Sequence, residues 1–186
     1  MKEEISDNLW NHYRKADQTR SIHALIQLRY ERYNRFIRLF ITIGSAVSAM
    51  LIFAALSAQY RLFAGLLAAF ISIINAVRSE IRYDTLAKER GIALQLWGDW
   101  LKDAIKFGDV EMQKMSDDQA KVKHDQLMEA YKSIMASTPP ISDKQFLRGK
   151  QKHLQKIAIS KALDKNPHKS LKQIKRELKA SGGSLN

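Results

Sequence analysis

The chain contains one long apolar stretch, residues 39–77, in which Arg61 is the only charged residue. Its first part, residues 39–58, is long enough for a helix to cross a hydrocarbon layer of about 30 Å. Its second part, residues 62–77, is slightly shorter than a usual membrane-spanning helix. Only residues 59–61 separate the two parts. The pattern therefore predicts a helical hairpin with its turn at residues 59–61.

This hairpin has two interpretations. In lipid every backbone polar group needs a partner inside the protein, and a pair of apolar helices meets that need. The alternative is the buried core of a soluble helical protein, which the abundance of Ala, Ser and Gly would suit. A buried core needs other apolar helices to cover it, and the rest of the chain is strongly charged. We therefore expect an all-α membrane protein with a two-helix transmembrane hairpin, extended by long cytosolic helices and a basic helical tail.

Basic residues flank both outer ends of the apolar stretch. Residues 1–38 contain no Gly or Pro and read as a helix from about Asn8, with arginines and tyrosines near its end. The bias of basic residues toward the cytoplasmic side predicts that both termini lie in the cytoplasm. The alternative for this segment is an ordinary solvated basic helix. The residues expected to meet lipid headgroups are Arg29, Arg32, Arg35, Arg38, Arg78 and Arg82.

Small and polar residues recur at helical spacing inside the apolar stretch. Gly44 and Ser48 form a small-xxx-small pair, which lets helices approach closely in lipid. A further stripe either packs the hairpin against a neighbour or faces water in a pore. Because two helices cannot enclose a channel, a pore would require several copies of the chain. The stripe consists of Thr42, Ser45, Gly65, Ser72 and Asn75.

Residues 78–136 read as a cytosolic helical region. The pattern predicts that one helix continues from Arg78 toward Phe107 and that an amphipathic helix follows from about Val110 to Met135. Trp97 and Trp100 lie on the apolar stripe of the first of these helices. They are expected either to anchor at the membrane interface or to pack against a neighbouring helix such as the N-terminal one.

Two prolines mark a linker at residues 137–140, and the composition changes after it. Residues 141–186 carry twelve basic and three acidic residues. They predict one helix, capped by Ser142 or Asp143, to about Leu163, and another from Asn166-Pro167 to about Leu178. This tail is a solvated appendage, a surface for anionic lipid, or a binding site for nucleic acid or an acidic protein. The candidate contact residues are Arg148, Lys150, Lys152, Lys156, Lys172, Lys175 and Arg176.

Nothing in the sequence points to catalysis. There are no cysteines, and the five histidines are scattered without metal-ligand spacing. Glu80 and Asp84 lie one turn apart, but Arg78 and Arg82 alternate with them, which favours salt bridges along a helix. We therefore expect a non-enzymatic protein without a cofactor or a metal.

The layout resembles the SLATT family, the two-transmembrane effector domains of prokaryotic conflict systems. The resemblance covers about residues 8–135 and rests on the hairpin between polar helices and on Leu9-Trp10, Tyr13-Arg14, Arg20 and Arg29. It implies an effector in the bacterial inner membrane that oligomerises and forms a pore, and it offers no catalytic residues. It also implies a partner sensor: a nucleotide synthase, a SLOG nucleotide-binding domain or a reverse transcriptase.

The sequence thus leads to one expected function with two alternatives. The expected function is a membrane effector of antiviral defence that depolarises the cell, in abortive infection, when its sensor is triggered. The first alternative is a soluble helical protein that binds nucleic acid or acts as a scaffold. The second is a membrane anchor for a partner enzyme.

Overall fold

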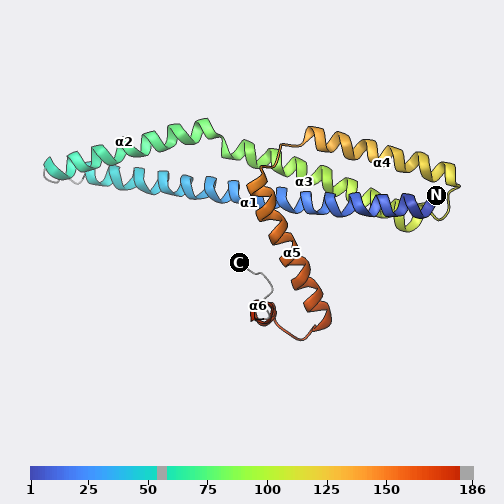
Figure 1. The fold of residues 1–186 in the computed structure, drawn as a ribbon. Helices are drawn as coiled ribbons and strands as arrows, with labels where there is room; N and C mark the ends of the chain where they lie inside the picture. Colours follow the sequence, from blue (N-terminus) through green and yellow to red (C-terminus); the bar gives the residue numbers. More distant parts are fainter. Residues whose placement is uncertain (54–57, 181–186) are drawn as a thin grey trace. The chain divides into compact units, whose positions relative to one another are not determined.

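The computed structural model describes residues 1–53 and 58–180, and within them the chain is helical and contains no β-strand (Figure 1). This confirms the all-α prediction. The helices, in chain order, are α1 (Lys2–Phe53), α2 (Ala58–Ile81), α3 (Tyr83–Lys106), the π-helical segment η1 (Phe107–Glu111), α4 (Asp117–Ser137), α5 (Asp143–Lys165) and α6 (Leu171–Ala180).

The chain forms two compact units. The first unit combines Met1–Leu25 with the chain from Ile92 onward, and the second is Ile26–Gly91. Helices α1 and α3 contribute residues to both units.

The core of the first unit lies between the N-terminal part of α1, the later part of α3, and α4. Its centre is aromatic: the Tyr131 ring has its centroid 5.1 Å from that of Trp97 and 5.3 Å from that of Trp100, both edge-to-face. His12 of α1 contacts the same ring at 5.0 Å. Burial of large apolar side chains of this kind is the main favourable term in folding. The buried cluster is Ile5, Leu9, Ala16, Trp97, Trp100, Leu101, Ala104, Phe107, Met112, Ala120 and Leu127.

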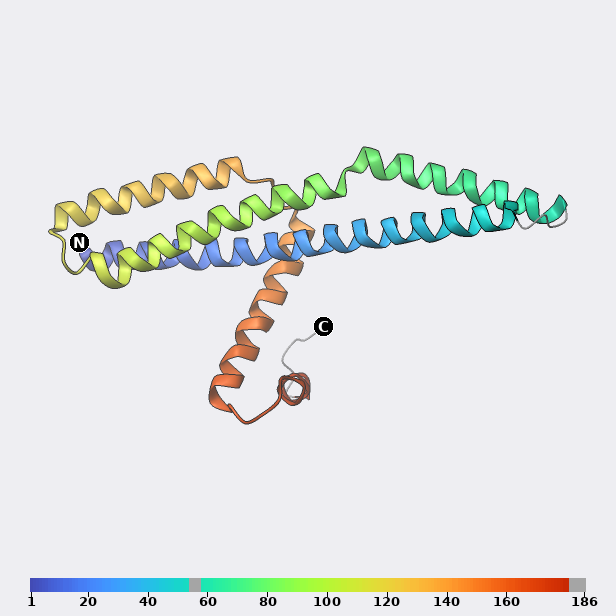
Figure 2. The same cartoon turned by 180° about the vertical axis from the view of Figure 1, so that it is seen from behind.

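In the second unit the later part of α1 and helix α2 form an antiparallel pair, and they lie side by side in Figures 1 and 2. A Cβ atom placed on Gly44 would lie 2.6 Å from Ile71 Cδ1. Further along the pair, Arg78 Nε donates a 3.3 Å hydrogen bond to Asn34 Oδ1. The residue number therefore rises along one helix while it falls along the other, as the hairpin prediction requires.

Several helix boundaries differ from the predictions. The expected turn at residues 59–61 lies inside α2, and the connection to α1 falls at residues 54–57, outside the described residues. The helix expected to continue from Arg78 to Phe107 is broken at Arg82, whose φ of 47° is left-handed and cannot continue a right-handed helix. The next helix, α4, begins at Asp117 rather than near Val110, because Ser116 caps it.

The basic tail is a two-helix structure rather than an extended segment. Ser142 caps α5 and exchanges hydrogen bonds with Gln145 in a capping box. Asn166 ends α5, so the second tail helix begins at Leu171 and not at the predicted Asn166-Pro167. Within this second tail helix, α6, the Ile174 side chain is 1% exposed.

Helix α5 also packs on α1. Gly149 is buried so closely against Ile22 that an added Cβ atom would overlap that side chain. One turn further along α5, His153 Nδ1 lies 3.2 Å from Ser21 Oγ, and its Nε2 lies 3.8 Å from Asp17 Oδ2. These contacts fix the side of α5 that faces α1.

Candidate functional site

The α1–α2 pair exposes its apolar residues. Two helices are long and apolar enough to cross a membrane. In the most apolar 18-residue segment of α1 only 6% of the residues are buried. In that of the second candidate span, the helical range Gln59–Glu111 that includes most of α2, only 11% are buried. Phe53 is 86% exposed and Leu62 is 69% exposed. Single exposed apolar residues are ordinary on a soluble protein, but a continuous surface of this size marks contact with a membrane or another protein.

The contact between α1 and α2 is made by small residues on one side of each helix. Ser48 is 3% exposed and Ala64 is fully buried, and Gly44 faces Ile71. The Ser48 hydroxyl is buried without a hydrogen-bond partner among the described residues. The small-xxx-small pair of Gly44 and Ser48 thus lies where α1 approaches α2.

The predicted polar stripe lies elsewhere. All five of its residues are exposed, so none of them is buried between α1 and α2. The Ser72 hydroxyl donates a 2.9 Å hydrogen bond to the Ala68 carbonyl oxygen one turn earlier and needs no outside partner. The Asn75 amide makes no hydrogen bond within the described residues. The stripe consists of Thr42, Ser45, Gly65, Ser72 and Asn75.

The arginines predicted at the headgroup level lie in the second unit, at the end where α1 and α2 leave the apolar stretch. Arg78 is half-buried and hydrogen-bonded to Asn34, and the others are exposed: Arg29, Arg32, Arg35, Arg38 and Arg82. The Tyr83 ring lies between two tyrosines of α1, 6.2 Å from Tyr30 and 6.3 Å from Tyr33. Tyrosine is enriched at membrane–water interfaces, and arginine is in excess in the cytoplasmic segments that flank membrane-spanning helices.

Sequence reasoning missed two residues of this region. Asn34 holds Arg78, and Arg90 is 8% exposed, with its burial lowering the pKa of the guanidinium from its ordinary value. The burial of Arg90 has a signal in the sequence: it lies three residues after Ala87, on the same face of α3. No sequence signal indicates the Asn34 contact, because it joins residues 44 positions apart.

Trp97 and Trp100 are buried inside the protein, so their position does not support the first alternative, anchoring at a membrane interface. They are 1% and 3% exposed and belong to the core of the first unit. The Trp100 indole Nε1 donates a 2.8 Å hydrogen bond to the Leu127 carbonyl oxygen of α4. The alternative, packing of this helix against the N-terminal helix, agrees with the structure, because Leu9 and Ala16 of α1 share the cluster.

The candidate contact residues of the tail are all exposed on α5 and α6. They are Arg148, Lys150, Lys152 and Lys156 on α5, and Lys172, Lys175 and Arg176 on α6. The last residues of the predicted tail, 181–186, lie outside the described residues.

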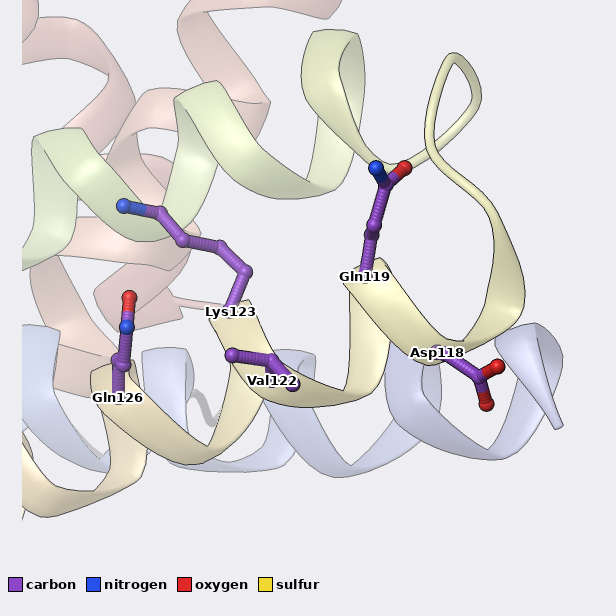
Figure 3. A pocket seen from close by; sticks show the side chains of 5 residues that line it. All are labelled: Asp118, Gln119, Val122, Lys123 and Gln126. Atoms are coloured by element: carbon purple, nitrogen blue, oxygen red, sulfur yellow. The ribbon is translucent and has the colours of Figure 1, made fainter.

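Other surface features offer less. A hollow of about 360 Å³ lies along α4, and all five of its lining residues come from that one helix (Figure 3). The Asp118 carboxylate points away from Lys123 there, so the two do not form a shared polar site. Within residues 1–53 and 58–180, no three His, Asp or Glu side chains are grouped so as to hold a metal ion.

The fold and its exposed apolar pair define an all-helical protein with two helices able to span a membrane. Comparison of the chain with family models, with curated proteins and with solved structures finds no match.

Proposed function

We propose that this chain is an integral membrane effector of a prokaryotic defence system, inserted through α1 and α2, which self-associates into a pore that depolarises the cell. The observation that carries the proposal is the exposed apolar surface of these helices, with 6% and 11% of their most apolar segments buried. A hairpin serving as the core of a soluble protein would have its apolar side chains covered.

The exposed polar stripe supports self-association. In a hydrocarbon layer the Asn75 amide needs hydrogen-bond partners, and it has none within the described part of its own chain. Small residues at Gly65 and Ser45 let a second copy approach closely. A ring of several copies would place Asn75 and Ser72 against one another or around water, which is the arrangement of a pore.

The trigger is proposed to come from a partner sensor acting on the cytoplasmic helices. This part rests on the resemblance of residues 8–135 to the SLATT domains. A sensor of that kind would bias an oligomer between a closed and an open state, so it must bind the two states with different affinity.

Fractionation of cells expressing the full chain tests the proposal first. We expect the chain to stay in the membrane pellet after an alkaline wash and to lower the membrane potential, reported by a voltage-sensitive dye, when expressed at high level. Recovery in the soluble fraction would overturn the membrane assignment. The chain could instead stay in the pellet while the membrane potential is unchanged and no dye leaks, even when its partner triggers it. That result would favour a membrane anchor.

A further inference from the structure

Helix α6 has a fixed orientation on α5. Ile174 is 1% exposed, and Leu178, one turn later, is half-buried, so this edge of α6 packs against the rest of the unit. The helix start is fixed as well, because the Ser170 backbone N–H donates to Gln173 Oε1 at 2.8 Å and the Gln173 N–H to Ser170 Oγ at 3.3 Å. Because each residue of an α-helix is rotated by about 100° from the one before, the sequence determines which residues lie on the edge opposite Ile174.

Three basic residues lie on the side of α6 away from Ile174. Lys172, Lys175 and Arg176 follow the spacing i, i+3, i+4, which places them on one side of a helix, and all three are exposed. None of the three is paired with an acidic side chain in the described part of the chain.

The few carboxylates of the tail do not neutralise this edge. Glu177, the only acidic residue of α6, accepts hydrogen bonds from Lys169 Nζ at 2.8 and 2.9 Å. Asp143 lies in the first turn of α5, where its charge complements the helix N-terminus. Lys152 and Lys156 of α5 are exposed as well, so they add positive charge to the same two-helix structure.

From this arrangement we infer that α5 and α6 form a binding surface for the phosphate backbone of a nucleic acid, with Lys172, Lys175 and Arg176 as its centre. Lysine and arginine on one helix edge bind successive phosphates and release counterions. The recognition is independent of base sequence, because Phe146 is the only aromatic residue of the tail and offers little base stacking. The inference stands separately from the membrane proposal.

A lipid surface fits the α6 edge less well. A helix that lies on a membrane buries an apolar face among the acyl chains. On α6 the apolar edge is partly occupied: Ile174 is 1% exposed and Leu178 is half-buried, while Leu171 at the helix start is 50% exposed. Leu147 and Leu154 of α5 are 66% and 56% exposed, so the experiment includes anionic lipid as a competing ligand.

The test uses the full chain in nanodiscs of neutral phosphatidylcholine and a fluorescent single-stranded RNA, titrated at several salt concentrations. Binding is expected, with log K falling linearly against log salt. Replacing Lys172, Lys175 and Arg176 by Gln is expected to make the slope shallower by about 2, since each phosphate contact on a single strand contributes about 0.7. If the membrane assignment fails, the same titration is performed on the soluble chain.

A matched variant controls for net charge. Replacing Lys114, Lys121 and Lys132 by Gln removes the same charge from exposed positions outside α5 and α6, and it is expected to leave the slope unchanged. Equal effects of the two triple variants, or no RNA binding by the unaltered chain, would overturn the inference. So would loss of binding to phosphatidylglycerol vesicles in the α6 variant while its RNA binding is unchanged, since that assigns the edge to lipid.

Discussion

The indole Nε1 of Trp100 donates a 2.8 Å hydrogen bond to the Leu127 carbonyl oxygen and so joins α3 to α4 inside the aromatic core. The neighbouring Trp97 is buried to the same degree, but its Nε1 has no hydrogen-bond partner among the described residues. Two tryptophans on the same helix, in the same core, therefore differ in one interaction.

This pair gives a direct measure of the hydrogen bond. Both Trp→Phe substitutions remove similar volume, but Trp100→Phe also removes a buried hydrogen bond to the Leu127 carbonyl oxygen, which contributes about 0.5–1.5 kcal/mol. Trp97→Phe removes an indole N–H that has no partner. We expect Trp100→Phe to lower the free energy of unfolding more than Trp97→Phe does, by about that amount, in denaturant titrations followed by circular dichroism. Equal destabilisation by the two variants would contradict the expected role of the hydrogen bond.

Gly149 of α5 lies so close to Ile22 of α1 that adding a single methyl group at position 149 should disturb the packing of α5 on α1. Gly149→Ala is expected to loosen α5 from α1, because overpacking in a well-packed contact costs about 1–3 kcal/mol. Faster trypsin cleavage within α5 would report the loosening. Ile22→Ala in the same chain removes two of the three atoms nearest to the new Cβ, so the double variant should be cleaved more slowly than Gly149→Ala alone. An unchanged cleavage rate in Gly149→Ala would contradict the docking contact.

Arg82 interrupts the path from α2 to α3 in a left-handed conformation. That conformation costs a non-glycine residue about 1–2 kcal/mol, which glycine avoids. We expect Arg82→Gly to be at least as stable as the unaltered chain and Arg82→Val, with its branched Cβ, to be less stable, in thermal unfolding of the detergent-solubilised protein. The reverse order would mean that the chain is continuously helical through this position.

The alkaline limit of stability should depend on Tyr131. Burial raises the pKa of its hydroxyl above the ordinary value near 10. A group with a raised pKa in the folded state contributes stability that is fully present below about pH 10 and is lost as the pH rises through the folded pKa. Tyr131→Phe should therefore retain more of its neutral-pH stability above about pH 10 than the unaltered chain does, as measured by denaturant titration at each pH. Burial also raises the pKa of Tyr13, so the Tyr131→Phe variant should keep a smaller dependence of its stability on alkaline pH.

Asn75 provides the sharpest test of the proposed pore. Asn75→Leu removes the amide but keeps the helix apolar, so we expect loss of toxicity and of depolarisation with membrane retention intact. Ile73→Leu, an exposed apolar neighbour, is the matched control and should stay toxic. If Asn75→Leu is as toxic as the unaltered chain, Asn75 has no part in the pore.

Much of the fold could be predicted because its signals are local. The apolar stretch, the prolines at 139 and 140 and the cap at Ser142 each act within a few residues, and all of them correspond to features of the described helices. Ser116 is a signal of the same local kind, but the predicted helix start near Val110 missed it. The break at Arg82 could not be predicted, because arginine has no preference for a left-handed conformation. The placement of Trp97 and Trp100 was ambiguous for another reason: an amphipathic stripe is the same whether it faces lipid headgroups or another helix.

By itself the sequence determined which segments are helical, where charge is concentrated and which helices are apolar enough for a membrane, because these depend on local composition and periodicity. The tertiary structure decided which face of each helix is covered. It placed Trp100 against Leu127, Gly44 against Ile71 and Ile174 in the interior, and it left Asn75 and the basic edge of α6 exposed. Those assignments depend on contacts between residues far apart in the chain, which no local pattern encodes.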